Sequence, residues 1–419
     1  MIFRIILFLI LCDASLCQTN TKINIPDDLN RPYSLKEYSF LIMDTPRQLY
    51  SMRQYNKNYL SALRLVVKRA SEVLGPLRTN ILHQLASLFL APLTHEEGHR
   101  SVLTHLGIGS ISKPFFNEKG AAYVMGVRDS ELKTLRDNDL PNYIRLHTAG
   151  IESDYMLVDR IQTNVVLSKE DREHLMIEYL IRQLQLVGYY FTSMFPSMEP
   201  DIDEEKNELQ RDIVGHDVYG AVRHLHRPTI EFYRYTRYKD LARDEKTFVT
   251  RAGYRSLLNL VDPFIFRILD RSLGGSFKVA MGMGYTMVPF GDMIEQKFWV
   301  RINDRTRLKL HVREYQNKED WFFAGGIALF DHSLSDRLYL NTALDVWEQP
   351  AELSFTGHGS EIGGALNTML KYVVRRGEDD PGELFSFDIG LLIKSAGFLP
   401  EELYLEDVVH YRLGTTLWF

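Results

Sequence analysis

The hydrophobic pattern of this chain changes its period at Gly274-Gly275, and this change limits the possible folds more than any other feature. Before it, apolar residues recur at helical spacing, as in residues 59–67. After it, apolar and polar residues alternate, as in residues 307–313 and 338–347. A period of two is typical of strands that present different faces to different surroundings. The sequence therefore predicts an α+β protein, with a mostly helical N-terminal part and an all-antiparallel β part.

Helical periodicity continues through the first part of the chain. Residues 81–106 form a long apolar segment, in which Pro92 is expected to bend the helix. Helical patterns follow in residues 143–161 and 170–190, and residues 254–273 are expected to form the last helix. The helical domain is therefore assigned to residues 18–273.

The alternating part, residues 274–419, contains eight candidate strands, most of about ten residues, a length that crosses a membrane as a tilted strand. They are 277–288, 294–303, 307–313, 321–331, 338–347, 362–372, 385–393 and 409–419. The last strand ends on Phe419 and resembles the closing strand of bacterial outer-membrane barrels. Longer loops at 348–359 and 395–408 fit the outer side of such a barrel. The sequence thus predicts an eight-stranded antiparallel β-barrel, and a soluble sandwich remains the alternative.

These two alternatives assign the alternating residues to different surroundings. In a barrel, leucines such as Leu310 and Leu340 would meet lipid, while Arg307, Lys309 and Arg313 would point into a polar interior. In a sandwich, the same leucines would form a dry core between two sheets. Alternation alone does not distinguish the two.

The N-terminus has the features of a secretory signal. Arg4 precedes a short apolar run at residues 5–11, and Ser15-Leu16-Cys17 offers small residues before a cut at Gln18. We therefore assign residues 1–17 to a signal peptide and expect an exported protein, at the outer membrane with a periplasmic N-terminal domain. A net charge of −6 gives no reason to expect nucleic acid as a partner.

A short motif indicates a metal site. His95, Glu96 and His99 form a His-Glu-x-x-His pattern within the helical segment 81–106. Residues four apart share one helix face, so both imidazoles can reach one Zn²⁺ ion. Glu96 is then placed to take a proton from a water activated by the zinc.

A third ligand is needed, and Glu152 in the next long helical segment is the first choice, with Asp154 as the competing one. A Glu on a helix some fifty residues after the motif resembles the gluzincin metallopeptidases. The resemblance implies a zinc held by His95, His99 and Glu152, with a nearby acid supporting the histidines. Asp159, on the same helical face as Glu152, is the candidate for that support.

A second constellation lies at residues 215–220, where His216 and Tyr219 flank Asp217. Zinc peptidases need a group that stabilises the oxyanion opposite the metal, so His216 and Tyr219 are candidate catalytic residues beside Glu96. The alternative is that Asp217 only caps a helix.

Together these features predict a zinc metallopeptidase that acts on a peptide or protein substrate and associates with the outer membrane. Two alternatives remain open at this stage. One is a non-enzymatic outer-membrane structural or binding protein with a structural or vestigial metal site. The other is a soluble secreted hydrolase whose β part binds substrate.

Overall fold

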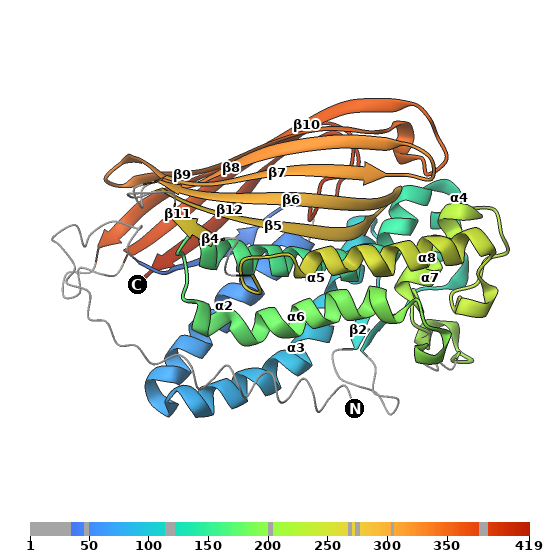
Figure 1. The fold of residues 1–419 in the computed structure, drawn as a ribbon, viewed down its shortest axis with the longest axis horizontal. Helices are drawn as coiled ribbons and strands as arrows, with labels where there is room; N and C mark the ends of the chain where they lie inside the picture. Colours follow the sequence, from blue (N-terminus) through green and yellow to red (C-terminus); the bar gives the residue numbers. More distant parts are fainter. Residues whose placement is uncertain are drawn as a thin grey trace.

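The computed structural model describes residues 35–45, 50–113, 122–199, 204–266, 270–272, 277–302, 306–376 and 384–419. Within them, an antiparallel sheet arches over a layer of helices (Figure 1). The expected α+β class is confirmed. The expected signal peptide, residues 1–17, lies outside the described residues.

The described part of the chain contains seven α-helices. They are α2 (Met52–Leu74), α3 (Pro76–His105), α4 (Asp129–Asn138), α5 (Leu140–Val166), α6 (Arg172–Thr192), α7 (Asp217–His226) and α8 (Arg243–Ser256). Local chemistry sets several of their ends: the Ser51 side chain caps α2 by accepting the Gln54 N–H, and Pro76 opens α3. The expected helix at 254–273 is wrong, because α8 ends at Ser256. None of the helices described here is both long and apolar enough to cross a membrane.

Among the described residues, ten strands form the main sheet, in the order β1-β12-β11-β10-β9-β8-β7-β6-β5-β4. They are β1 (Glu37–Met43), β4 (Asp270–Ser272), β5 (Phe277–Val288), β6 (Gly291–Ile302), β7 (Thr306–Gln316), β8 (Trp321–Ser335), β9 (Leu338–Pro350), β10 (Ser360–Arg376), β11 (Leu384–Lys394) and β12 (Val408–Trp418). The eight strands expected from alternation are all present. A closed eight-stranded barrel is wrong for the described residues, because β1 and β4 extend the sheet and stand unpaired with each other at its two edges.

Strand β1 connects the two parts of the chain. It pairs with β12 from Glu37 opposite Trp418 to Met43 opposite Leu413, although it comes from the segment assigned to the helical domain, 18–273. The main sheet therefore contains residues from both sides of the expected domain boundary at residue 274. Pairing of the first and last strands brings distant segments together and fixes α2, which directly follows β1, against one edge of the sheet.

The two faces of the main sheet differ in polarity. Toward the helices, strand β7 buries Arg307, Lys309 and Arg313, whereas Leu310 on the opposite face is 38% exposed. The other sheet found in the described chain is the short pair β2 (Ile111–Lys113) and β3 (Tyr123–Met125), which packs on α3 and not on this face. The dry core of the sandwich alternative is therefore not formed over Leu310.

Candidate metal centre

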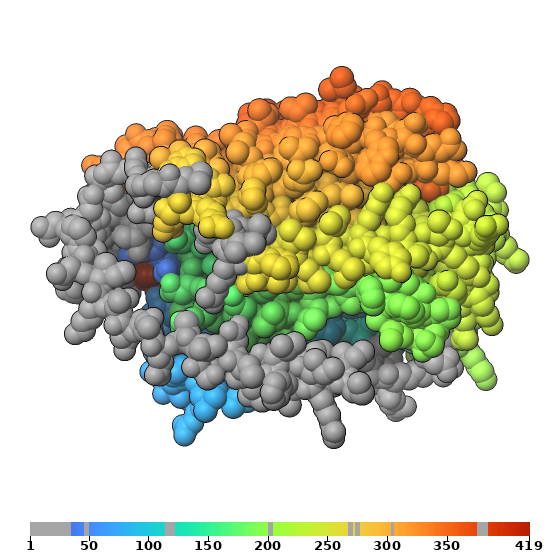
Figure 2. Space-filling model, in the orientation of Figure 1, coloured from blue at the N-terminus to red at the C-terminus, as the bar shows by residue number. Residues whose placement is uncertain are grey.

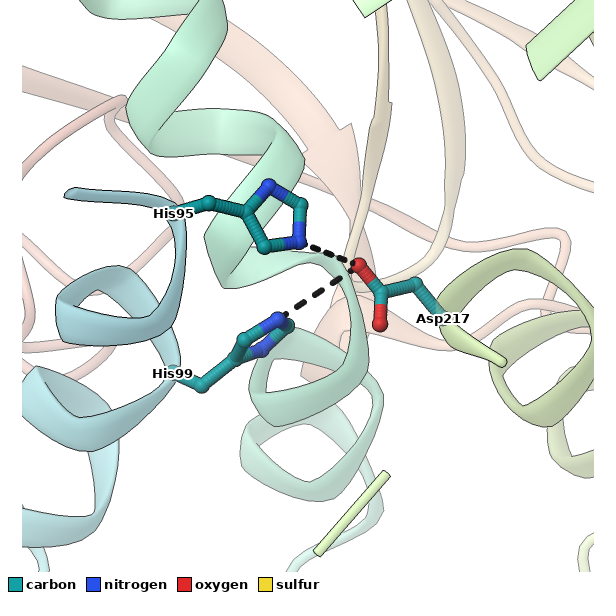
Figure 3. A group of neighbouring side chains, drawn as sticks. All are labelled: His95, His99 and Asp217. Carbon is teal, nitrogen blue, oxygen red and sulfur yellow. Dashed lines mark hydrogen bonds and ion pairs between the residues drawn. The ribbon is translucent and has the colours of Figure 1, made fainter. Parts of the chain in front are cut away.

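The two histidines of the motif lie one helical turn apart on α3 and point away from solvent. His95 is 6% exposed and His99 is 1% exposed. Their side chains extend from the same face of the helix toward one carboxylate (Figure 3). The helical spacing of the motif thus does what the sequence predicted, since it directs both imidazoles to one point.

That carboxylate belongs to Asp217, the first residue of α7. Its Oδ2 lies 3.0 Å from His95 Nε2 and 3.4 Å from His99 Nε2. One donor atom from each of the three residues lies within 4.8 Å of the others, and all three residues are buried. Two imidazole nitrogens and a carboxylate oxygen are the donors that zinc accepts in catalytic sites with three protein ligands.

Hydrogen bonds at the far side of each ring fix the orientation of the histidines. The Nδ1 of His95 lies 2.8 Å from Asp154 Oδ2, and the Nδ1 of His99 lies 2.6 Å from the carbonyl oxygen of Leu146. Both partners are acceptors, so Nδ1 carries the proton in each neutral ring and Nε2 keeps its lone pair. Metal-binding histidines typically have this kind of support.

Three acceptor atoms therefore converge on one buried point, which calls for a positive charge between them. The pKa values agree with this. Burial would lower the pKa of His95, but the carboxylates of Asp154 and Asp217 raise it well above its ordinary value. Burial would raise the pKa of Asp217, but His99 and His95 hold it well below its ordinary value. The donor set fits a divalent metal ion.

Two glycines let α5 approach α3 closely enough to hold the rings. A Cβ added to Gly150 would lie 2.4 Å from His95 Nε2 and 2.5 Å from His99 Nε2. A Cβ added to Gly98 would lie 2.5 Å from the carbonyl oxygen of Ala149. Real Cβ atoms do not approach other atoms this closely, so each of the two positions requires glycine in this packing.

Two acidic side chains border the centre. Glu96 follows His95 on α3 and is partly buried. Burial raises the pKa of its carboxyl to about 8; His99 and His95 oppose this rise, while Asp212 and Asp217 add to it. Burial likewise raises the pKa of Asp212 to about 6. A carboxyl group with a pKa near neutrality can both accept and donate a proton at neutral pH.

Tyr189 on α6 is a residue of the centre that sequence reasoning missed. Its hydroxyl oxygen accepts the backbone N–H of Asp217 at 3.1 Å, and its ring stacks on His95 with 5.8 Å between centroids. It therefore connects His95 to the helix that carries Asp217. Tyr189 lies in a segment expected to be helical, but no motif marks it.

The structure does not place Glu152 with the histidines. Its carboxylate pairs with Arg145, with 2.7 Å between Glu152 Oε1 and Arg145 Nη2, and accepts the backbone N–H of Glu401 at 2.7 Å. The third ligand expected from the gluzincin resemblance is therefore wrong in this geometry. Asp217 occupies that place, about twice as far along the chain from His99.

Two other acids of α5, Asp159 and Asp154, also differ from the roles expected of them. Asp159 does not support the histidines, because it pairs with Lys309 at 2.6 Å and with Lys297 at 3.0 Å on the sheet. Asp154, expected as the competing third ligand, provides the support instead. It accepts from His95 with one oxygen and from Arg182 Nη1 at 2.9 Å with the other.

The two expected oxyanion-stabilising residues lie at the start of α7, and their contacts are mainly structural. The Tyr219 hydroxyl donates to the carbonyl oxygen of Ser193 at 2.9 Å and is therefore already engaged. His216 stacks on the Tyr219 ring with 3.6 Å between centroids, and its Nδ1 accepts the Tyr219 N–H at 3.5 Å. Burial lowers the pKa of His216 to about 4. This geometry does not support Tyr219 as a group that stabilises the oxyanion.

The fold and the centre together define an α+β protein in which two histidines and an aspartate converge between α3, α5 and α7. Comparison with protein-family models, with curated proteins and with solved structures found no match to this chain.

Proposed function

We propose that His95, His99 and Asp217 bind a zinc ion and that the protein is a zinc-dependent hydrolase acting on peptide bonds. One observation carries the proposal. Two imidazole Nε2 atoms and one carboxylate oxygen meet at 3.0 to 3.4 Å in a buried place, while both Nδ1 atoms contact hydrogen-bond acceptors. This is the arrangement of ligands and supporting groups found at zinc sites.

The groups around the centre suit hydrolysis. A bound zinc ion would supply Lewis acidity and lower the pKa of water in the site. Glu96 stands next to His95 on the same helix and is partly open to solvent, so it can take a proton from an attacking water and deliver it to a leaving amine. The His-Glu-x-x-His motif, which resembles that of metallopeptidases, favours a peptide bond as the substrate.

The test uses the purified full-length chain loaded with zinc. Wild type is expected to hold about one zinc per chain and to hydrolyse unfolded casein. Glu96→Gln should keep the metal and lose turnover, because the amide cannot accept the proton. Glu97→Gln is the matched control: Glu97 is bound to the Tyr50 hydroxyl at 2.6 Å, and the variant should keep both metal and activity. Casein hydrolysis by Glu96→Gln at the wild-type rate would exclude Glu96 as the group that accepts the proton.

A second candidate function is a structural metal that ties α3 to α7. It is favoured by the burial of all three donor residues, of which Asp217 is 2% exposed. A structural site is closed, whereas a catalytic site keeps one position open. Zinc binding that stabilises the fold, without casein hydrolysis by wild type, would select this candidate.

A further inference from the structure

Six residues, one from each strand from β7 to β12, form a row that crosses the sheet, and all six have large apolar side chains. Each residue of the row stands opposite the next on the neighbouring strand. All six are 38% to 64% exposed. They are Leu310, Ile327, Leu344, Leu366, Ile393 and Val409.

The rows on both sides of this one are also uncharged. One runs from Leu308 to Tyr411 and contains only leucine, threonine and tyrosine. The other runs from Val312 to Gly364 and contains only valine and glycine. We call these three rows the outer band. A contiguous apolar surface of this extent on a soluble protein marks a contact with a partner or a membrane.

The opposite face of the same strands carries the charges. Lys309, Lys371 and Arg412 are 8%, 0% and 1% exposed, and they are paired with acids: Lys309 with Asp159 at 2.6 Å, and Lys371 with Asp331 at 2.8 Å. In a soluble antiparallel sheet the apolar face is covered and the polar face meets water. Here the polarity is reversed.

The edge of the sheet at β1 is sealed by polar side chains of α2. Asn58 accepts the Leu41 N–H at 2.7 Å and donates to the Leu41 carbonyl at 2.8 Å. Gln54 donates to the Ile42 carbonyl at 2.9 Å, and Ser61 donates to the Ser39 carbonyl at 2.6 Å. These side chains take the place of a second partner strand, which the described residues do not provide for β1.

Strand β5 is sealed in the same way where β4 does not cover it. Asn259 accepts the Tyr285 N–H at 2.9 Å and donates to the Tyr285 carbonyl at 3.0 Å, and the Tyr190 hydroxyl accepts the Met287 N–H at 2.8 Å. In hydrocarbon, the backbone N–H and C=O groups at a sheet edge need hydrogen-bond partners within the protein, because no water is present to supply them. The seal achieves with helix side chains what a barrel achieves by closure.

We propose that the outer band lies against the hydrocarbon of a lipid bilayer. Hydrocarbon is complementary to a surface without charge. An interface with a protein partner would instead be expected to contain about one hydrogen bond per 100–200 Å². The strands of the band have 11 to 17 residues, which is long enough for a hydrocarbon core of about 25–30 Å.

The shape of the face also favours lipid over a second copy of the chain. The sheet arches over the helices, so the outer band is on its convex side (Figure 1). In the space-filling view the orange segments of the sheet line the upper side of the molecule, above the helical layer (Figure 2). Two rigid convex faces touch along a narrow strip, whereas fluid lipid follows the curvature.

Site-specific labels test the proposal on the full chain. Its two cysteines, Cys12 and Cys17, are replaced by serine. A single cysteine at Leu344 in the outer band, or at Tyr254 on α8, then carries an environment-sensitive fluorophore. With vesicles of palmitoyl-oleoyl phosphatidylcholine, the Leu344→Cys label should gain emission and lose it again when the acyl chains carry a quencher. The Tyr254→Cys label should do neither.

A third label separates the outer band from a rival apolar surface. Leu85 on α3 is 50% exposed. Quenching of the Leu85→Cys label without quenching at Leu344 would assign the membrane contact to α3 and overturn the proposal. Dimers in solution that shield the Leu344 label without lipid would overturn it too, as would a Leu344 label unaffected by vesicles.

A charge substitution gives a second readout. Leu344→Lys should weaken partitioning into these vesicles by about 30-fold or more, because lysine is costly at the centre of a bilayer. Tyr254→Lys, at a position on the helical side that is 63% exposed against 48% for Leu344, should partition as wild type does. Circular dichroism of both variants establishes that they are folded. Equal partitioning of Leu344→Lys and wild type would contradict the proposal.

Discussion

The Nε2 atom of His95 lies 3.0 Å from Oδ2 of Asp217, although the two residues are 122 positions apart in the chain. This contact joins α3 to α7 and places a carboxylate where the two motif histidines need a third partner. Because both nitrogen and oxygen are acceptors in the neutral form of the ring, the contact is favourable only with a proton or a metal ion between them. The identity of the third donor is therefore the sharpest point to test.

Asp217→Asn should weaken zinc binding by more than about 100-fold, since it removes an anionic ligand, whereas Glu152→Gln should bind zinc like wild type. Metal content after dialysis and a competition titration measure both variants. The pair discriminates directly between the donor that the fold provides and the one that the sequence predicted. Normal zinc affinity in Asp217→Asn would exclude Asp217 as a ligand.

Asp154→Asn should weaken zinc binding by about 10-fold to 100-fold without abolishing it, because the carboxylate holds the His95 ring and raises its basicity. Asp159→Asn is the matched control on the same helix. Its partners are Lys297 and Lys309, so zinc affinity should not change even where stability does. If the two variants bind zinc equally well, the supporting role of Asp154 is wrong.

Gly150→Ala should destabilise the fold by about 2 kcal/mol or more and reduce zinc binding, because the new methyl group would meet both imidazoles. Gly188→Ala on α6 provides the control, since nothing lies within 4 Å of a Cβ added there. That variant should be as stable as wild type or gain up to about 1 kcal/mol. Urea unfolding measures both, and equal stability of the two variants would contradict the close packing of α5 on the histidines.

Acid should remove stability that Glu170 contributes. Burial would raise the pKa of Glu170, but the hydrogen bond with His174 and the charge of Arg64 lower it from 4.5 to about 2. A lowered pKa means stability that is present above about pH 4.5 and is lost as the pH falls toward 2, amounting to about 3 kcal/mol. Glu170→Gln should be less stable than wild type at pH 7 and lose less stability between pH 5 and 3. A parallel loss in both proteins would exclude this contribution.

Local patterns determined much of the architecture. Alternation in residues 277–419 predicted the eight strands β5 to β12, because side chains on a strand point to opposite faces whatever the tertiary fold. The same rule placed Arg307, Lys309 and Arg313 on the face opposite Leu310, and only the packing of the helices decided which of these two faces is buried. The four-residue spacing of His95 and His99 predicted a shared direction on one helix.

The alternation did not predict whether the sheet would close into a barrel. In the described part of the chain the main sheet has ten strands, and the outer ones are β1, from the other end of the chain, and the short β4. Whether an edge meets another strand or a helix depends on packing. Here the side chains of Asn58 and Asn259 satisfy edge backbone groups, and a strand pattern carries no information about them.

The third donor was decided only by tertiary structure. Residues 142–155 of α5 are all buried, so periodicity could not show which side of this helix faces α3. The packing turns Asp154 toward His95 and Glu152 toward Arg145. Asp217 reaches the histidines from α7, a helix placed by contacts across more than a hundred residues. A motif on one helix determines the direction of its own side chains, whereas a ligand from another helix depends on how the two helices pack.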